Sequence, residues 1–363
     1  MASTSALKKD IVLVGGGGAG MILARALVGR LDTTRYTFTL INNRAFTVFL
    51  PTSVRMAATE EGHLEDEILL PYDRLLKDIG TLKVGKTVKI EEDAPGKGGR
   101  VVLADGETVH YDVLVLAPGT RLESPLDYPD SKEDVLRYIA EWRTKFRDAT
   151  KIVMGGGGPT NVELAGEIKD LWPEKSVTIV QSRNLPFNDI YADRFRRRIA
   201  AECKNLGINF VFNDYLDGHT PTDGVVRTRK GKELPADLVI TSHGGFPKTE
   251  FIKSLGDDVV TLRGLVRVKP TLEVPGHPGV FCIGDVIDNN ERNRLAKYLK
   301  HAQIVEPTAA YGGSFETIRI SLGKSGGVTY WGVLGGIVVG SWFTGRAQSR
   351  HLLAPQARRL MGY

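Results

Sequence analysis

The sequence predicts an α/β protein with two nested Rossmann-like domains, one inserted into the other, and a small C-terminal α+β segment. Two observations predict this fold. The order strand, glycine run, helix, strand occurs near the start of the chain and recurs later. A late apolar strand that ends in Gly-Asp is then expected to return to the first domain. The predicted segments are 1–120, 121–263, 264–312 and 313–363.

Composition is that of a globular protein. Hydrophobic residues make up 42% and charged residues 25% of the 363 residues, which is ordinary for a soluble domain. The two cysteines, Cys203 and Cys282, lie far apart in the chain. Their spacing excludes a disulfide scaffold and the paired-cysteine chemistry of many reductases. Both are expected to be buried, small apolar residues.

The ends of the chain bear on localisation. The start, Met-Ala-Ser-Thr-Ser, is not a secretory signal, and Ala2 stands where N-myristoylation requires glycine. No apolar run is long enough to span a bilayer, so we expect a cytoplasmic protein. Residues 317–363 contain six Lys or Arg and no Asp or Glu, and aromatic residues lie among them. This segment fits either peripheral contact with an anionic membrane or lipid droplet, or a solvated basic face.

The first domain opens with a strand over 10–14, a glycine run over 15–20, a helix over 21–31 and a strand over 36–41. The glycines fit the GxGxxG pattern of dinucleotide-binding units. The first allows the tight turn, the second lets the backbone approach a diphosphate, and the third lets helix and strand pack closely. The free N–H groups of the helix start would face the phosphates. The residues predicted at this site are Gly15, Gly17, Gly18, Ala19 and Gly20.

The second strand of this unit ends without the usual acid. Asn42 stands where a carboxylate would bind the ribose hydroxyls. Its amide oxygen can still accept one hydroxyl proton, although a simple polar strand end is the alternative. Farther along, three strands over 82–91, 100–103 and 108–116 are predicted to form an antiparallel meander that ends in Ala117-Pro-Gly119.

The inserted domain repeats the plan. We predict a helix over 130–147, a strand over 151–154, a glycine run over 155–158, a helix over 161–171 and a strand over 176–180. The frame that keeps the helix in phase uses Gly156, Gly158 and Asn161. Asn161 replaces the third glycine and would push the helix off the strand or cap its start.

The nucleotide specificity of this second unit is open. The expected acid is replaced by Gln181, followed by Ser182 and Arg183. Without a carboxylate a 2′-phosphate is not repelled, and Arg183 could pair with it, so NADPH is expected to be tolerated. The alternative is that Arg183 points to solvent. Glu163, in the first helical turn, would orient a nicotinamide or interact with the helix dipole.

The remaining elements complete both domains. A second meander and a strand over 236–241 end in Ser242-His-Gly244, and a buried strand over 279–285 ends in Gly-Asp. A helix is predicted from near 294 to about 311. Residues 314–363 are expected to form strands and a terminal helix. No metal-ligand pattern and no nucleic-acid motif is present.

These motifs together resemble a known group. Their order is similar to that of the two-dinucleotide-binding-domain flavoproteins. Gly156–Ile168, Trp172–Thr178, Gly276–Asp285 and His301-Ala-Gln303 closely resemble the apoptosis-inducing-factor-homologous, mitochondrion-associated proteins, the ferroptosis suppressor group. That group is also similar to type II NADH dehydrogenases, and the resemblance covers nearly the whole chain.

The resemblance implies an oxidoreductase, a flavoprotein that binds FAD noncovalently, takes hydride from NADH or NADPH, and passes electrons to a quinone-type acceptor or oxygen. It places FAD in segments 1–120 and 264–312 and NAD(P)H in segment 121–263. Several cofactor contacts come with it. They are Arg55, Thr87, Ala117, Gly119, Gly244, Gly284, Asp285, His301 and Ala302. Glu163 matches the family glutamate near the nicotinamide, and Gln348 aligns with a functional lysine.

Departures from the family keep two other functions open. Asn42, Asn161 and Gln348 are compatible with a pathway-specific flavin oxidase acting on a small metabolite. The basic surface is compatible with a redox-responsive binding protein that uses NADH to switch its contacts. The oligomeric state and the acceptor have no signature in the sequence.

Overall fold

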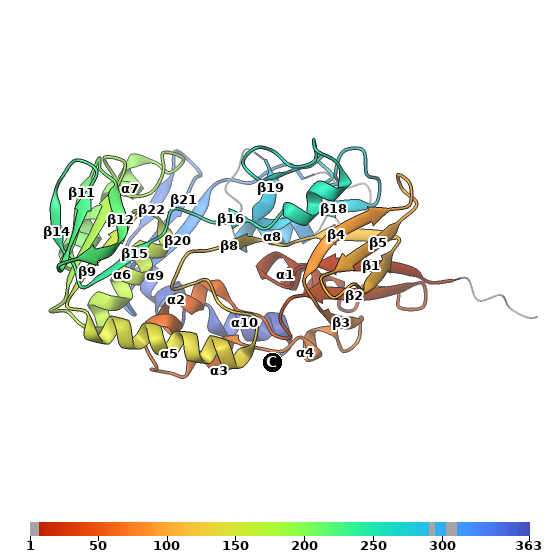
Figure 1. Ribbon diagram of the computed structural model, residues 1–363, viewed down its shortest axis with the longest axis horizontal. Helices are drawn as coiled ribbons and strands as arrows, with labels where there is room; N and C mark the ends of the chain where they lie inside the picture. The colour runs from red at the N-terminus through yellow and green to blue at the C-terminus, as the bar shows by residue number, and fades with distance from the viewer. Residues whose placement is uncertain (1–6, 290–294, 303–310) are drawn as a thin grey trace, which may run out of the picture.

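The computed structural model describes residues 7–289, 295–302 and 311–363 and shows two lobes side by side (Figure 1). Ala2 and Gln303 therefore lie outside the described residues. The first lobe is built on a parallel sheet of order β18-β7-β1-β2-β3. Its strands, in chain order, are β1 Lys9–Val14, β2 Tyr36–Asn42, β3 Thr81–Val84, β7 Val113–Leu116 and β18 Val280–Cys282.

Strand β18 closes this sheet only after the whole second lobe has been built. Val280 pairs with Leu114 of β7, and the second sheet lies between them in the sequence. The predicted nesting of the two Rossmann-like domains is therefore confirmed. We retain 1–120, 121–263, 264–312 and 313–363 as proposed boundaries.

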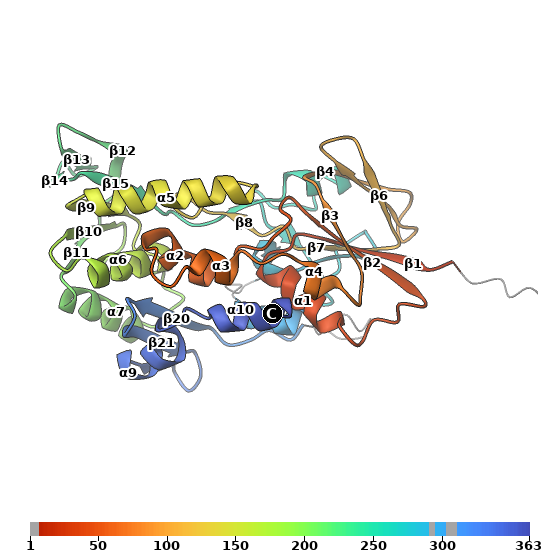
Figure 2. The same ribbon diagram turned by 90° about the horizontal axis from the view of Figure 1, so that it is seen from below.

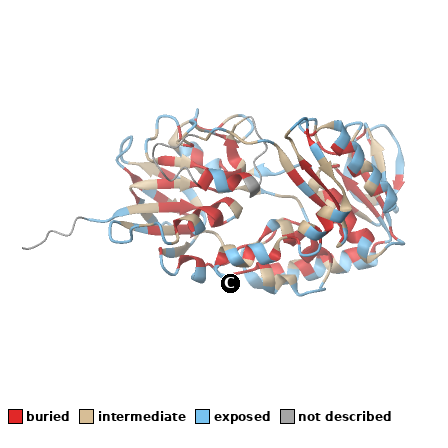
Figure 3. Ribbon diagram, turned by 180° about the vertical axis from the view of Figure 1, so that it is seen from behind, coloured by how far each residue is buried: buried red, intermediate tan, exposed pale blue. Residues whose placement is uncertain are grey.

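The second lobe carries a parallel sheet of order β11-β10-β9-β15. Its strands are β9 Lys151–Gly155, β10 Ser176–Gln181, β11 Ile208–Phe212 and β15 Leu238–Thr241. Helices α5 Lys132–Asp148, α6 Pro159–Leu171 and α7 Asp193–Asn205 accompany it. Alternating strands and helices of this kind bury both faces of a parallel sheet, and buried residues run along both sheets in Figure 3.

Two predicted strands of the first meander are each divided in the structure. The stretch 82–91 forms β3 in the parallel sheet and β4 Thr87–Glu92 in the meander. The stretch 108–116 forms β6 Thr108–Tyr111 and β7. The chain changes sheets at Asp112, whose N–H donates to Asp10 O and whose carboxylate accepts from Asp10 N. The meander itself is β4-β5-β6, with β5 at Gly99–Leu103.

The second meander is antiparallel as predicted, from β12 Leu216–Thr222 through β13 Val225–Thr228 to β14 Glu233–Pro235. Two short strands, β8 Thr120–Arg121 and β16 Phe246–Pro247, pair antiparallel where the chain crosses between the lobes (Figure 1).

Several further helices belong to the first part of the chain. Helix α1 Gly18–Leu27 follows the first glycine run, and α2 Leu50–Ala58, α3 Leu64–Ile68 and α4 Asp73–Leu76 follow β2. Of these, α2 packs on α5 and α6 of the second lobe (Figure 2). Strands β17 Val266–Arg267 and β19 Ile287–Asp288 form a short parallel pair. The predicted helix over 294–311 is seen as α8 Leu295–Ala302, and its continuation over 303–310 lies outside the described residues.

The C-terminal segment joins the two lobes. Strands β20 Thr317–Leu322, β21 Gly326–Trp331 and β22 Ile337–Val339 form an antiparallel sheet that packs on α6 and α7 of the second lobe. After α9 Ser341–Thr344 and a π-helical turn, Gly345–Ser349, helix α10 Ala354–Met361 packs on α1, α3 and α4 of the first lobe (Figure 2). Both lobes are thus bridged by the last strands and helix, as well as by the crossings at β8 and β16.

Candidate active site

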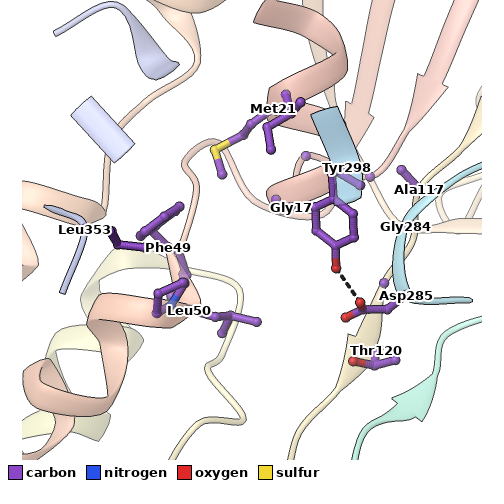
Figure 4. Close-up of a pocket in the computed structure, with 18 of the residues that line it drawn as sticks. Gly17, Met21, Phe49, Leu50, Ala117, Thr120, Gly284, Asp285, Tyr298 and Leu353 are labelled. Atoms are coloured by element: carbon purple, nitrogen blue, oxygen red, sulfur yellow. Dashed lines mark hydrogen bonds between the residues drawn. The ribbon is translucent and has the colours of Figure 1, made fainter. Parts of the chain in front are cut away.

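A cavity of about 1060 Å³ runs from the first glycine loop to the C-terminal segment. Its size is at the upper end of small-molecule sites. Six regions that are distant in the sequence line it, namely the start of α1, the end of β2, the end of β7, the start of α6, the turn after β18, and the C-terminal segment. Figure 4 shows labelled residues around it. The predicted site residues in its lining are Gly15, Gly17, Gly18, Ala19, Asn42, Ala117, Gly119, Glu163, Gly284, Asp285 and Gln348.

The first glycine loop has the shape that a diphosphate requires. Gly15 has φ +105°, and a Cβ there would come within 2.2 Å of Ala117 O. A Cβ on Gly20 would lie 2.0 Å from Gly15 O, so helix α1 packs directly on the turn. Gly17 faces open space at the N-terminus of α1. This cradle fits the FAD diphosphate, because free helix N–H groups meet the cavity where no side chain blocks it.

Asn42 braces this loop from the neighbouring strand. Its Oδ1 accepts the N–H of Gly16 at 3.0 Å, and its Nδ2 donates to Arg44 O at 2.8 Å. The Tyr72 hydroxyl donates to Gly16 O at 2.6 Å. Burial raises the pKa of the Tyr72 phenol above its usual range, so it stays a neutral donor. No local motif signals Tyr72, because it reaches the loop from the distant residue that precedes α4.

The turn after β18 places Asp285 in the cavity, where it accepts a hydrogen bond from the Tyr298 hydroxyl (Figure 4). His301 and Ala302, expected to contact FAD, are instead buried in α8 and outside the lining. His301 Nδ1 accepts the Gly284 N–H at 3.3 Å. Helix α8 therefore presents Tyr298 to the cavity, one turn earlier than expected, and uses His301 to hold the turn.

Arg55 and Thr87 do not line the cavity either. Arg55 is buried, and its Nε and Nη2 donate to both carboxylate oxygens of Glu167 at 2.6 and 2.9 Å. Its guanidinium also donates to the carbonyls of Arg350 and Ser349. Thr87 starts β4 in the meander. Arg55 thus ties α2 to α6 and to the C-terminal segment, and a direct contact with FAD does not follow from its position.

The second glycine loop repeats the backbone of the first. Gly156 has φ +97°, and a Cβ there would lie 2.3 Å from Ser242 O. Gly158 faces open space at the N-terminus of α6. Gly244 follows β15 with φ +118° and also borders open space. The carboxyl edge of the second sheet therefore offers a second dinucleotide cradle, in the frame predicted from the sequence.

Asn161 fills the place of the third glycine. Its Nδ2 donates to Gly155 O at 2.8 Å and to Gly156 O at 2.9 Å, and its side chain is fully buried. It is not the helix cap, which is Gly158. The expectation of a capping role is therefore corrected. The side chain bridges the two carbonyls at the strand end, since its Cβ prevents the close packing that Gly20 allows.

Gln181 and Arg183 are both engaged within the second domain. Gln181 is buried, accepts the Gly157 N–H at 3.1 Å through Oε1 and donates from Nε2 to Leu185 O and Phe187 O. Arg183 is half exposed and forms an ion pair with Asp189. Arg183 therefore does not simply point to solvent, and its charge is matched by a carboxylate. Ser182 lies between these two residues in the turn after β10.

Glu163 and Gln348 both line the cavity and both hydrogen-bond to β20. The Glu163 carboxylate accepts from Ser321 N and Ser321 Oγ at 3.1 and 2.9 Å. Gln348, on the π-helical turn, donates to Arg319 O at 3.4 Å. Both line the same cavity. Helix α6 thus connects the second glycine loop to the space beside the first.

The lining of the cavity includes cations that the sequence did not single out. Arg44, Arg121 and Lys248 line it near the crossing strands. Arg121 pairs with Asp127, while burial, followed by the neighbouring Arg44, lowers the pKa of Lys248. These residues come from the end of β2, from β8 and from the loop after β16. Only the folded chain places them together.

Fold and site together define a flavoprotein-type oxidoreductase with two dinucleotide-binding domains. Residues 9–305 match the family described as pyridine nucleotide-disulphide oxidoreductase, so the chain belongs to this family. It is an FAD-dependent oxidoreductase family whose members use FAD and NAD(P)H.

Individual relatives agree with this assignment. The chain is 38% identical to FAD-dependent oxidoreductase FVFD30 of Flammulina velutipes over 320 residues, covering 85% of this chain and 99% of the relative. It is 25% identical to ferroptosis suppressor protein 1 of Taeniopygia guttata, with coverages of 97% and 95%. The sulfide:quinone oxidoreductase of Aquifex aeolicus has a similar fold, with a TM-score of 0.74 at 17% identity and coverages of 98% and 91%.

Proposed function

We propose that the protein oxidises NAD(P)H through FAD and delivers the electrons to a quinone-type acceptor. The observation that carries this proposal is the shape of the cavity, which continues from the FAD cradle into an apolar end. Phe49, Leu50 and Leu353 lie together on one side in Figure 4, away from Asp285 and Tyr298. An apolar slot of this kind suits a planar, uncharged acceptor.

The cysteines support the same proposal by leaving no protein dithiol. Cys203 and Cys282 are the whole complement of the sequence, and both are buried, as expected. Burial raises the pKa of Cys203 to about 12 and that of Cys282 still further above its usual range. Neither forms a reactive thiolate at neutral pH. Despite the family's name, the acceptor of this chain must meet the flavin itself.

The residues around the cavity have definable tasks. The bound flavin supplies the hydride and electron chemistry. The N-termini of α1 and α6 bind the two diphosphates. Glu163, fixed by Ser321, would orient the nicotinamide at the start of α6, and Asn42 would accept a ribose hydroxyl while holding Gly16. Gln348 would hydrogen-bond to the acceptor or to the flavin edge.

Rapid mixing of anaerobic protein with NADH tests the proposal. We expect the visible absorbance of the flavin to bleach and then to return when a short-chain ubiquinone is added. Bleaching that no quinone or oxygen reverses would favour an NADH-responsive binding protein. Failure to bleach would exclude the reductase.

We also propose that the C-terminal segment contacts an anionic membrane surface. Leu334, Ile337 and Trp342 are exposed around β22, and exposed Arg346 follows α9. Apolar side chains beside cations favour interfacial binding. No helix in the described ranges is both long enough and apolar enough to cross a bilayer. Sedimentation with vesicles containing phosphatidylserine, compared with neutral vesicles, tests this contact.

A further inference from the structure

The loop that follows β10 contains a carboxylate that the strand end lacks. In a Rossmann unit the end of this strand lies beside the adenosine ribose of the nucleotide. Here it ends in Gln181, whose amide is committed to the glycine loop. Two residues farther on, Arg183 forms an ion pair with Asp189 from the same loop. A guanidinium and a carboxylate therefore stand together in the loop that follows this strand end.

Asp189 is held in place by a second, buried guanidinium. Its Oδ1 lies 3.0 Å from Nη1 of Arg196, a side chain that is only 4% exposed. Arg196 is fixed in turn, because its Nε donates to Pro186 O at 3.0 Å. Asp189 itself is 65% exposed. The carboxylate therefore keeps its position and its solvent-facing side even when Arg183 moves.

Neighbouring carboxylates do not share this arrangement. Asp193 contacts Arg196 at 3.0 Å and Arg197 at 3.2 Å, on the first turn of α7. Asp214 is buried and accepts the N–H groups of Tyr215 and Lys230 at 2.8 and 3.2 Å. Of these three acids, Asp189 is the one paired with Arg183.

We propose that Asp189 is a specificity-determining residue that makes the second nucleotide site prefer NADH to NADPH. The inference rests on the proposed function, because it concerns the hydride donor of that reaction. A ribose 2′-hydroxyl can donate to the Asp189 carboxylate. A 2′-phosphate adds nearly two negative charges beside it, and must also draw Arg183 away from its partner. The loop thus supplies the acid that the strand end lacks. We therefore expect a preference for NADH in place of the tolerance of NADPH expected from the sequence.

Binding of adenine nucleotides to the FAD-loaded protein tests this role without turnover. Isothermal titration compares 5′-AMP with 2′,5′-ADP, which differ by the 2′-phosphate. The wild type is expected to bind 5′-AMP more tightly. In Asp189→Asn the ratio of the two Kd values should shift about 10-fold toward 2′,5′-ADP, the size expected for removing one like charge at a partly solvated site. Arg183→Gln in the Asp189→Asn background should cancel that gain.

Asp193→Asn is the matched control, because it removes the same charge from the same buried Arg196 without touching Arg183. Its Kd ratio should equal that of the wild type. Equal shifts in Asp189→Asn and Asp193→Asn, or a wild type that binds 2′,5′-ADP as tightly as 5′-AMP, would overturn the inference while leaving NADH-dependent bleaching intact. Absence of both nucleotide binding and bleaching would overturn the proposed function itself.

Discussion

The two glycine loops share a backbone but differ in what holds it. Gly15 and Gly156 adopt nearly the same left-handed conformation, with φ +105° and +97°. A Cβ would strike the carbonyl of Ala117 at 2.2 Å in one and that of Ser242 at 2.3 Å in the other. The third position differs, since Gly20 packs without a side chain while Asn161 inserts an amide. Both loops therefore require glycine at the first position, whereas the third position accepts a residue with a side chain.

The ends of β2 and β10 use an amide side chain in the same way. Asn42 Oδ1 accepts from Gly16 N at 3.0 Å, and Gln181 Oε1 accepts from Gly157 N at 3.1 Å. Each amide nitrogen also donates to loop carbonyls. A carboxylate could accept but not donate. In both units an amide stands in place of the usual acid. The amide accepts a hydrogen bond from the glycine loop and donates one to the following turn, which a carboxylate could not do.

The largest effect is expected from alanine at the first glycine of each loop. Gly15→Ala combines a left-handed φ with a 2.2 Å clash against backbone, a combination expected to cost more than about 2 kcal/mol. The purified variant should have lost FAD and its yellow colour. Gly156→Ala should keep FAD and lose bleaching by NADH. Loss of flavin from both variants, measured by absorbance after denaturation, would contradict the assignment of one cofactor to each loop.

The two loops also show what the sequence can predict. The glycine frame, the order of strands and the nesting follow from local pattern, because steric limits at Gly15 and Gly156 act over a few residues. Tyr72, Arg55 and Tyr298 take their roles from tertiary contacts with Gly16, Glu167 and Asp285. The division of 82–91 between two sheets has the same cause, since period-two patterning does not say which partner a strand meets.

Asn161→Ala should have the next largest effect. It removes the hydrogen bonds to Gly155 O and Gly156 O. Gly155 O keeps the N–H of Ser242, so the loss falls mainly on Gly156 O. The expected loss is about 1–3 kcal/mol of unfolding free energy, measured by urea denaturation. Thr160→Ala, one residue earlier on the same helix and in the cavity lining, should change stability much less. Equal losses in the two variants would show that Asn161 does not support the loop through these bonds.

Restoring an acid at each strand end should give unequal results. Gln181 is buried and donates to Leu185 O and Phe187 O, so Gln181→Glu loses both bonds and buries a charge. We expect it to cost about 1–2 kcal/mol. Asn42 lines the cavity, so Asn42→Asp should cost less than about 1 kcal/mol and keep FAD. Thermal melts of both variants at pH 7 measure the two losses of stability. A larger loss in Asn42→Asp than in Gln181→Glu would contradict this prediction.

The smallest effect concerns the opposite ends of the two sheets, where Asp112 precedes β7 of the first sheet and Asp237 precedes β15 of the second. Asp112 accepts one N–H, from Asp10 at 2.7 Å, whereas Asp237 Oδ2 accepts from Thr150 N and Lys151 N, both at 2.8 Å, and from Thr150 Oγ1 at 2.6 Å. The Thr150 hydroxyl and these N–H groups lower the pKa of Asp237 below its usual 3.8. A carboxylate with a lowered folded pKa stabilises the fold above its unfolded pKa and loses that contribution as pH falls through the folded one.

The contribution of Asp237 to stability should therefore be lost at acid pH. Asp237→Asn should cost less than about 1 kcal/mol at pH 7, because the group is exposed and screened. The stability gap between wild type and variant should narrow as pH falls below 3.8, the unfolded value. Asp112→Asn affects one N–H donor instead of three donors. Its difference in unfolding free energy from the wild type at pH 7 should therefore be smaller. Urea denaturation at pH 7 and pH 3 measures both, and a gap for Asp237→Asn that is unchanged at pH 3 would mean that its charge does not hold the start of β9.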